Sequence, residues 1–250
     1  MLPILISIPH GGTRQPAELE GRVCLSEQHL FDDGDAFTRE IFDVREAGAS
    51  VISADVARAF VDLNRAPDDR PPANPDGVVK SLTCFKRPIY HPGAEPDDSL
   101  VELLLARYHR PYHERLRSAD PSEIRLALDC HSMAVVAPPI APHPGRPRPL
   151  LCLSNADGTT CPAELLESLA DALADAFECE AADVTLNDPF KGGYITRTHG
   201  GGEIPWIQVE MNRSLYLREP WFGRDRLRVD PSRLASLRDR FLAALGTLNL

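Results

Sequence analysis

The stretch Ile124–Met133 (IRLALDCHSM) joins an apolar run to a histidine. Its first half, Ile124–Leu128, follows polar and turn-forming residues, a pattern typical of a buried β-strand. Alternate residues of a strand point to the same side, so Asp129 and His131 share a face. In open α/β sheets, ligands bind beyond the carboxyl ends of the strands. The stretch therefore predicts a sheet with a functional site at the end of this strand.

The rest of the chain alternates between strand-like and helix-like segments. Apolar, β-branched runs predict strands, and longer segments with apolar residues at three- and four-residue spacing predict helices. This alternation favours an α/β fold with a mixed, mostly parallel sheet between helices. The predicted strands are Ile4–Ile8, Ala49–Ala54, Ala59–Leu63, Ile124–Leu128, Leu150–Leu153 and Ile204–Val209, and the predicted helices are Ser26–Val44, Ser99–Ser118, Pro162–Cys179 and Pro231–Leu248.

Two proline-rich segments interrupt this rhythm, 66–76 (APDDRPPANPD) and 138–149 (PPIAPHPGRPRP). Proline at this density rules out a helix or a central strand, so both segments are predicted to be stiff loops. A chain of 250 residues is within the size that one hydrophobic core can fill. We therefore expect a single domain over residues 1–250.

The net charge, the apolar stretches and the cysteines of the chain indicate which partners and which cellular location to expect. A formal net charge of -10 repels phosphate backbones and anionic lipid, so we expect no nucleic acid and no membrane partner. The apolar start is short and lacks a basic region before it, and no later stretch approaches the ~18 residues of a membrane helix. Six cysteines without a CxxC pair are typical of reduced thiols, which predicts a cytoplasmic protein. The oligomeric state stays open.

A second strand end also carries a histidine. The segment Ser7–Gly12 (SIPHGG) ends the strand Ile4–Ile8 with His10 and two glycines, which allow a sharp turn. Two histidines at two strand ends, His10 and His131, favour a shared metal ion, and Asp129 could orient the ring of His131. The alternative is that backbone carbonyls satisfy both histidines.

A catalytic zinc site needs three protein ligands and an open position for water. An HxxE pair with His10 is excluded because position 13 is Thr13. The nearest acidic cluster holds Asp33 and Asp35, and Asp35 heads the amphipathic run AFTREIF. We predict Asp35 as the third ligand, with Asp33 as the alternative. Acidic residues at a helix start can also be capping or solvated residues.

The segment 206–213 (WIQVEMNR) alternates polar and apolar side chains. Its polar residues Gln208, Glu210 and Asn212 share one face of a strand, a pattern that suits the wall of a cleft. A carboxylate beside a metal can act as a general base, so Glu210 is the predicted catalytic residue. The alternative is an ordinary polar face of a half-exposed strand.

Two segments concentrate cations that suit a carboxylate substrate. Segment 187–202 holds glycines and basic residues but no phosphate-loop spacing, which predicts a mobile anion-binding loop, with a plain surface loop as the alternative. Arg65 ends a predicted strand and could clamp a carboxylate with its planar fork, or form a salt bridge to Asp62 or Asp129. The predicted substrate-binding residues are Asn64, Arg65, Lys191, Arg197, His199 and Arg213.

In their order along the chain, five segments resemble the N-formylglutamate amidohydrolase, or N-formylglutamate deformylase, family. They are SIPHGG, DLNR, DCHSM, NDPFKGGYITRTHG and QVEMNR, and the resemblance covers about residues 4–217. It implies a fold similar to zinc-dependent carboxypeptidases and aminopeptidases. It also implies metal ligands at His10 and His131 with an acidic partner, Glu210 as the catalytic glutamate, and cations of the Arg65 and Arg197 segments near the substrate carboxylates.

With this resemblance, the sequence predicts an enzyme that uses one divalent metal, with zinc favoured, to cleave a small anionic N-acyl amino acid. The favoured reaction converts N-formyl-L-glutamate to formate and L-glutamate. One alternative is a deacylase or carboxypeptidase-like amidase for another N-acyl amino acid. Another is a metal-independent module that binds a small carboxylate. Nucleophilic catalysis by Cys130 or Ser132 is disfavoured because both neighbours of His131 point to the opposite face.

Overall fold

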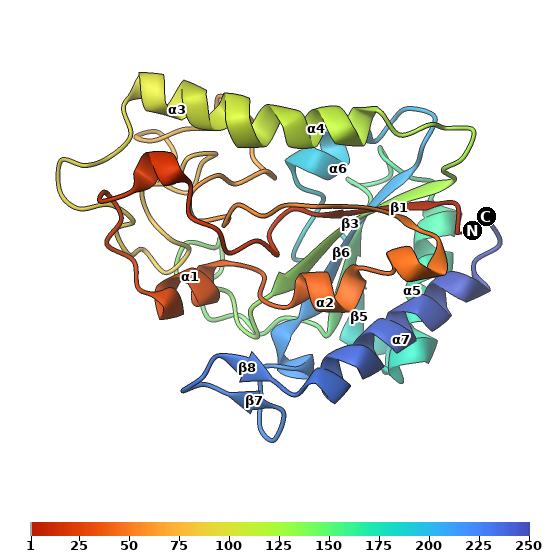
Figure 1. Ribbon diagram of the computed structural model, residues 1–250. Coiled ribbons are helices and arrows are strands. Elements are labelled where there is room, and N and C mark those ends of the chain that lie inside the picture. The colour runs from red at the N-terminus through yellow and green to blue at the C-terminus, as the bar shows by residue number, and fades with distance from the viewer. Residues whose placement is uncertain (1) are drawn as a thin grey trace.

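The computed structural model describes residues 2–250, which form a six-stranded sheet with helices on both faces (Figure 1). The order of strands is β2-β1-β3-β6-β4-β5. Strands β2, β1, β3 and β6 are parallel, whereas β4 runs antiparallel to β6 and parallel to β5. The predicted mixed, mostly parallel sheet between helices is therefore confirmed. The strands are β1 (Ile4–Ile8), β2 (Ser50–Ser53), β3 (Leu126–Met133), β4 (Leu151–Ser154), β5 (Val184–Leu186) and β6 (Trp206–Asn212), and a separate ribbon pairs β7 (Phe222–Gly223) with β8 (Arg228–Val229).

Helices cover the sheet from two sides, as Figure 1 shows. On one side lie α3 (Asp98–Leu104), a π-helical segment (Leu105–His109), α4 (Arg110–Arg117) and the short α6 (Tyr194–His199). On the other side lie α2 (Thr38–Phe42), α5 (Ala163–Phe177) and α7 (Pro231–Thr247). The remaining helical elements are α1 (Glu27–Asp33) and the 3-10 turns Ala17–Leu19, Arg45–Ala47, Ala181–Asp183 and Arg213–Leu215. Within residues 2–250, no helix combines the length and the apolar composition needed to cross a lipid bilayer.

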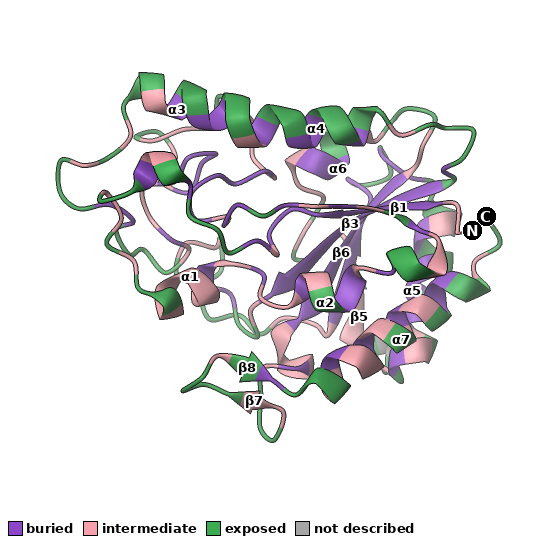
Figure 2. Cartoon of the chain, in the orientation of Figure 1, coloured by how far each residue is buried: buried purple, intermediate pink, exposed green. Residues whose placement is uncertain are grey.

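The two faces of the sheet bury two hydrophobic clusters. In β1, Ile4, Ile6 and Ile8 belong to the cluster that includes residues of α2, α5 and α7, whereas Leu5 belongs to the cluster under α3 and α4. This division follows from the alternation of side chains along a strand. Figure 2 shows the consequence: the central strands β1, β3 and β6 are buried, whereas the outer surfaces of the helices are exposed. Every residue of β1, β3 and β6 is buried.

Two of the predicted elements are wrong. The segment Ala59–Leu63, predicted as a strand, is instead a helical turn in which the backbone N–H groups of Phe60 and Val61 donate to the Ala57 carbonyl. Its apolar residues are buried all the same, and a short apolar run does not distinguish the two conformations. The predicted helix Ser26–Val44 is broken into α1 and α2: α1 ends before Gly34, whose backbone is extended, and α2 begins after Phe37, which is left-handed with φ 65°.

The segment 187–202 was predicted as a loop, but residues 194–199 form α6. The sequence prediction also missed β5, which has three residues, too few for a periodicity to be recognised. The two proline-rich segments contain neither helix nor extended strand, as expected. The second of them folds back on the chain before it through an isolated antiparallel bridge between Val136 and Pro147.

Candidate metal centre and active site

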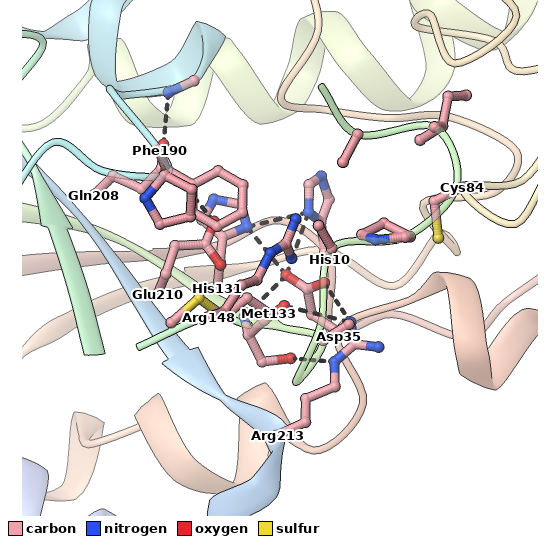
Figure 3. Close-up of a pocket in the computed structure, with 18 of the residues that line it drawn as sticks. His10, Asp35, Cys84, His131, Met133, Arg148, Phe190, Gln208, Glu210 and Arg213 are labelled. Carbon is pink, nitrogen blue, oxygen red and sulfur yellow. Dashed lines mark hydrogen bonds and ion pairs between the residues drawn. The ribbon is translucent and has the colours of Figure 1, made fainter. Parts of the chain in front are cut away.

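Three ligand atoms meet in a tight triangle at the ends of β1 and β3. The Nδ1 atom of His131 lies 3.1 Å from Nδ1 of His10 and 3.1 Å from Oδ2 of Asp35. The third side, from His10 Nδ1 to Asp35 Oδ2, measures 3.4 Å. Ligands about 2.0–2.1 Å from a tetrahedral zinc ion stand roughly 3.3 Å from one another, so the triangle has the size of three zinc ligands. All three residues are buried, and Figure 3 shows them among the side chains that line the pocket.

The fold explains why these residues converge. Strands β1 and β3 are parallel neighbours, so their carboxyl ends place His10 and His131 side by side. Asp35 lies in the break between α1 and α2, where its backbone N–H donates to the His10 carbonyl at 3.1 Å. The helix break that the sequence did not predict therefore brings Asp35 to the two histidines.

Each imidazole also contacts a carboxylate through the ring nitrogen that faces away from the triangle. His10 donates through Nε2 to Asp62 Oδ1 at 2.8 Å, and His131 Nε2 lies 3.0 Å from Asp129 Oδ2. Asp129 is itself fixed, because the Ser7 hydroxyl donates to its other oxygen at 3.0 Å. A histidine that donates through one nitrogen to a carboxylate keeps the lone pair of the other for a metal. The predicted orienting contact between Asp129 and His131 is present.

Buried carboxylates give this site a preference for positive charge. Burial would raise the pKa of Asp35, but hydrogen bonds from His10 and His131 hold it well below the usual range. The pKa of Asp62 is also held well below its usual range, by His10 and Arg58 against the effect of burial. Burial disfavours a charged His131, but Asp129 outweighs it and raises the pKa of His131. Buried carboxylates clustered around two imidazoles fit a divalent cation in the triangle.

The second oxygen of Asp35 is anchored by arginines. Arg213 Nη2 donates to Asp35 Oδ1 at 3.1 Å, and Arg58 Nη1 lies 3.7 Å from the same atom. Asp33, the alternative third ligand, has other partners: it accepts a hydrogen bond from the Cys84 backbone at 2.7 Å and lies 3.5 Å from Lys80. Of the two acids, only Asp35 belongs to the triangle.

Glu210 stands next to the triangle on the neighbouring strand. In the parallel pair of β3 and β6, its Cα is the register partner of His131, so both side chains point to the same side of the sheet. Gln208 donates to Glu210 Oε1 at 2.9 Å and itself accepts from the Gly193 backbone at 2.6 Å. Burial raises the pKa of Glu210; His131 opposes this rise and Asp35 adds to it. A buried, oriented carboxylate with a raised pKa suits proton transfer.

The triangle and Glu210 open into one cavity of about 940 Å³. One part of its wall is polar and includes Arg58, Asp62 and Gln208. Another part is apolar and comes largely from the proline-rich segment 138–149 together with Phe190.

Comparison with protein families gives a match to the N-formylglutamate amidohydrolase model over residues 2–217. This chain belongs to that family. N-formylglutamate deformylases of Pseudomonas putida and Pseudomonas aeruginosa are 31% and 33% identical over 87% of this chain and 83% of their own lengths. The resemblance inferred from the five sequence segments is therefore confirmed.

Solved structures agree with the family assignment. The N-formylglutamate amidohydrolase of Ralstonia eutropha JMP134 has a TM-score of 0.77 at 25% identity, covering 98% of this chain and 92% of the other. A gene product of Agrobacterium tumefaciens has a TM-score of 0.66 at 16% identity, covering 98% of this chain and 88% of the other. At that identity, the second likeness shows the fold alone.

In this amidohydrolase-family chain, four of the six predicted substrate-binding residues line the cavity: Asn64, Arg65, Lys191 and Arg213. Asn64 lies 3.2 Å from His131 Nε2 and accepts a hydrogen bond from the Ile195 backbone at 2.7 Å. The three cations already have acidic partners. Arg65 donates to Asp76 at 2.7 Å, Lys191 lies 3.2 Å from Asp157, and Arg213 holds Asp35.

The other two predicted residues, Arg197 and His199, do not line the cavity. Arg197 donates to the backbone carbonyls of Lys191 and Gly192, which closes the turn at the start of α6. His199 Nε2 lies 2.9 Å from His113 Nδ1, in a stack of histidines beneath α4. Both residues organise the α6 segment instead of facing the cavity.

Sequence reasoning assigned no role to two cations of the site. Arg58 lies 3.7 Å from Asp35 and 3.2 Å from Asp62. Arg148 lines the cavity from the proline-rich segment 138–149. The i,i+4 spacing of Arg58 and Asp62 could have predicted their ion pair, because residues at this spacing are neighbours on a helical turn. Arg148 gave no local signal, since its position depends on how a loop without periodicity folds back.

Proposed function

We propose that this protein hydrolyses N-formyl-L-glutamate to formate and L-glutamate, using one divalent metal for which zinc is the best candidate. One observation carries the proposal: a buried triangle of two imidazoles and a carboxylate shares a cavity with Glu210, in a chain of the N-formylglutamate amidohydrolase family. Two nitrogen ligands and one carboxylate, with room for a fourth ligand, are typical of a catalytic zinc site.

His10, Asp35 and His131 would hold the metal, and Asp62 and Asp129 keep the two imidazoles oriented toward it. A bound divalent metal supplies Lewis acidity, which polarises a carbonyl and makes water easier to deprotonate. Arg213 keeps the Asp35 carboxylate in place through its second oxygen. Each ligand is therefore preorganised by a neighbour before any metal arrives.

Glu210 would act as general base and then as general acid in the hydrolysis. It lies beside the triangle and on its side of the sheet, so it can take a proton from the water that attacks the formyl carbon. When the C–N bond breaks, the same carboxyl can deliver this proton to the departing nitrogen. Gln208 fixes one carboxylate oxygen and leaves the other free for the transfer. Water and amide thus give an amine and formic acid, which ionises to formate.

The cavity supports a second candidate, hydrolysis of a bulkier N-acyl amino acid. Its volume of about 940 Å³ is at the upper end of ordinary ligand pockets, and Met133, Ile140 and Phe190 give it an apolar flank. An acyl group larger than formyl, or an apolar amino-acid side chain, would fill that flank.

We also propose a cytoplasmic location, supported by six cysteines that are all unpaired.

A metal-replacement assay tests the proposed function. Purified protein is stripped with a chelator, reloaded with Zn²⁺, Mn²⁺ or Co²⁺, and supplied with N-formyl, N-acetyl and longer N-acyl forms of glutamate, glutamine and leucine. We expect one metal per chain, loss of activity on stripping, recovery with zinc, and the fastest turnover with N-formylglutamate. Faster turnover of a longer acyl substrate would favour the second candidate. Full activity in the stripped protein, or no hydrolysis of any substrate, would refute the metal-dependent amidase.

A further inference from the structure

The cations of the cavity wall are almost all neutralised. Arg58 pairs with Asp62, Arg65 with Asp76, and Arg213 with Asp35. Arg146 pairs with Asp188 and Lys191 with Asp157, both at the exposed rim. The remaining arginine of the wall is Arg148, and among the described residues no carboxylate lies within ion-pair distance of it. The cavity therefore has one cation whose charge the protein leaves uncompensated.

Arg148 also lacks hydrogen-bond partners for its side chain. Its Nε atom is buried and has no acceptor within residues 2–250. Its guanidinium carbon lies 4.8 Å from the centre of the Phe190 ring, which covers one face of the group. Buried donors nearly always find an acceptor, which for a guanidinium on a cavity wall is water or a group of a bound ligand. The Arg148 guanidinium is therefore available to an acceptor that enters the cavity.

The backbone holds this arginine in place. Pro147 and Pro149 flank it and restrict the chain. The Arg148 N–H donates to the Val135 carbonyl at 3.0 Å, and the Asn212 side chain donates to the Arg148 carbonyl at 3.2 Å. Asn212 belongs to β6, the strand that also carries Glu210. The loop residue is thus fixed relative to the catalytic carboxylate, and less freedom is lost when a ligand binds.

The side chain lies close to the reaction centre. Figure 3 shows Arg148 beside Glu210 and His131, and its charge is one of those that act on the Glu210 carboxyl. A planar guanidinium matches a carboxylate with two parallel hydrogen bonds. In a molecule with a net charge of -10, an anionic substrate needs such a local cation.

We propose that Arg148 binds a carboxylate of the substrate and thereby sets the preference for anionic N-acyl amino acids. The inference rests on the proposed function and adds to it the residue that recognises the negative charge. Glutamate offers two carboxylates, one on its α-carbon and one on its side chain. Two amide analogues separate them: N-formylglutamine lacks the side-chain carboxylate, and N-formylisoglutamine lacks the α-carboxylate.

The test compares the wild type with Arg148→Met and Arg148→Lys on N-formylglutamate and the two analogues. A charge-assisted hydrogen-bonded pair corresponds to roughly a 10- to 100-fold change in binding. We expect Arg148→Met to raise KM for N-formylglutamate by that factor with kcat within about threefold, and Arg148→Lys to recover part of the loss. For the analogue that lacks the recognised carboxylate, wild type and Arg148→Met should have equal KM values.

Arg226→Met is the control, because this arginine is 80% exposed and does not line the cavity. We expect it to keep KM within about twofold. Equal losses of Arg148→Met on all three substrates would overturn the inference and indicate a disturbed loop. The same loss in Arg226→Met would also overturn it. Thermal melting of each variant establishes that it is folded.

The inference can fail separately from the proposed function. If the wild type hydrolyses none of these substrates, the function is refuted, and calorimetric titration with N-formylglutamate still tests Arg148. Weaker binding to Arg148→Met than to wild type would support the inference. Equal affinities, or no binding to the wild type, would overturn it.

Discussion

His10 Nε2 lies 2.8 Å from Asp62 Oδ1, which turns the other ring nitrogen of His10 toward Asp35 and His131. Asp62 is at the end of a helical turn that begins near Arg58, far from His10 in the sequence. The orientation of the His10 ring therefore depends on a residue outside the triangle of His10, Asp35 and His131.

Replacing Asp62 with asparagine should weaken metal binding. The amide lacks the charge that supports the His10 ring, and loss of such an outer contact typically costs about 10- to 100-fold in metal affinity. We expect this loss for Asp62→Asn in a competition titration with a fluorescent zinc chelator. Asp171→Asn, an exposed change on α5, is the control. Equal zinc affinity in Asp62→Asn and wild type would contradict the role of Asp62.

Replacing Glu210 with glutamine should remove proton transfer and keep the shape of the site. General acid–base catalysis contributes about 10²- to 10⁴-fold, so we expect kcat to fall by that factor. Metal content, measured by elemental analysis, should stay at the wild-type level because Glu210 is outside the ligand triangle. Glu203→Gln, an exposed change, should leave kcat unaltered. A Glu210→Gln enzyme with wild-type kcat would rule out this role.

Lys80 should be essential for stability. Its side chain is completely buried, with Nζ 2.7 Å from Asp76, 3.5 Å from Asp33 and 3.6 Å from Asp62. Removing one partner leaves buried carboxylates uncompensated, which costs about 3–5 kcal/mol. We expect urea denaturation of Lys80→Met to show a loss of that size.

The matched change Lys86→Met removes an exposed lysine nearby and should alter the free energy of unfolding by less than about 0.5 kcal/mol. A Lys80→Met protein as stable as the control would mean that the buried ion pairs contribute no net stability.

The histidine stack should make the protein less stable in mild acid. Burial lowers the pKa of His113 to about 3, with His109 adding to the effect, and burial lowers that of His199 to about 4. Unfolded histidines titrate near pH 6.5 and so bind more protons than the native ones in this range. Native stability is therefore complete above about pH 6.5 and decreases as the pH falls toward about 4.

His199→Gln isolates one member of the stack. The glutamine amide can still donate to His113 Nδ1, but it does not titrate. We expect the free energy of unfolding of this variant, from urea titrations at several pH values between 7.5 and 4.5, to decline less steeply than that of the wild type. Parallel curves would assign the acid sensitivity to other groups.

Much of the site could be predicted because it lies on strands. His10, His131 and Glu210 stand at or near the ends of buried apolar runs, and strand alternation specifies which of their neighbours share a face. The prediction of Asp35 had a weaker basis, since the segment Ser26–Val44 was expected to be continuous helix. The helix instead stops before Gly34, which is extended, and Phe37 is left-handed; hydrophobic periodicity reveals neither conformation.

Residues on loops were harder to assign, because ion pairing depends on contacts remote in sequence. Arg65 and Arg213 were chosen as substrate clamps, but Asp76 and Asp35 already engage them. Arg148 had no predicted role, because only the fold of the proline-rich segment 138–149 brings it to the cavity. A sequence gives the number of cations, but not which of them remain unpaired.

The pairing of β3 with β6 carries a risk during folding. Sliding β6 by one residue would put Val209 or Met211 opposite His131 and turn Glu210 toward the hydrophobic cluster under α5 and α7. Burying a carboxylate in that apolar cluster costs free energy, which disfavours the slipped arrangement. Glu210 therefore also favours correct alignment of the two strands. Glu210→Gln reduces this penalty, and misaligned chains of that variant would be tolerated longer while it folds.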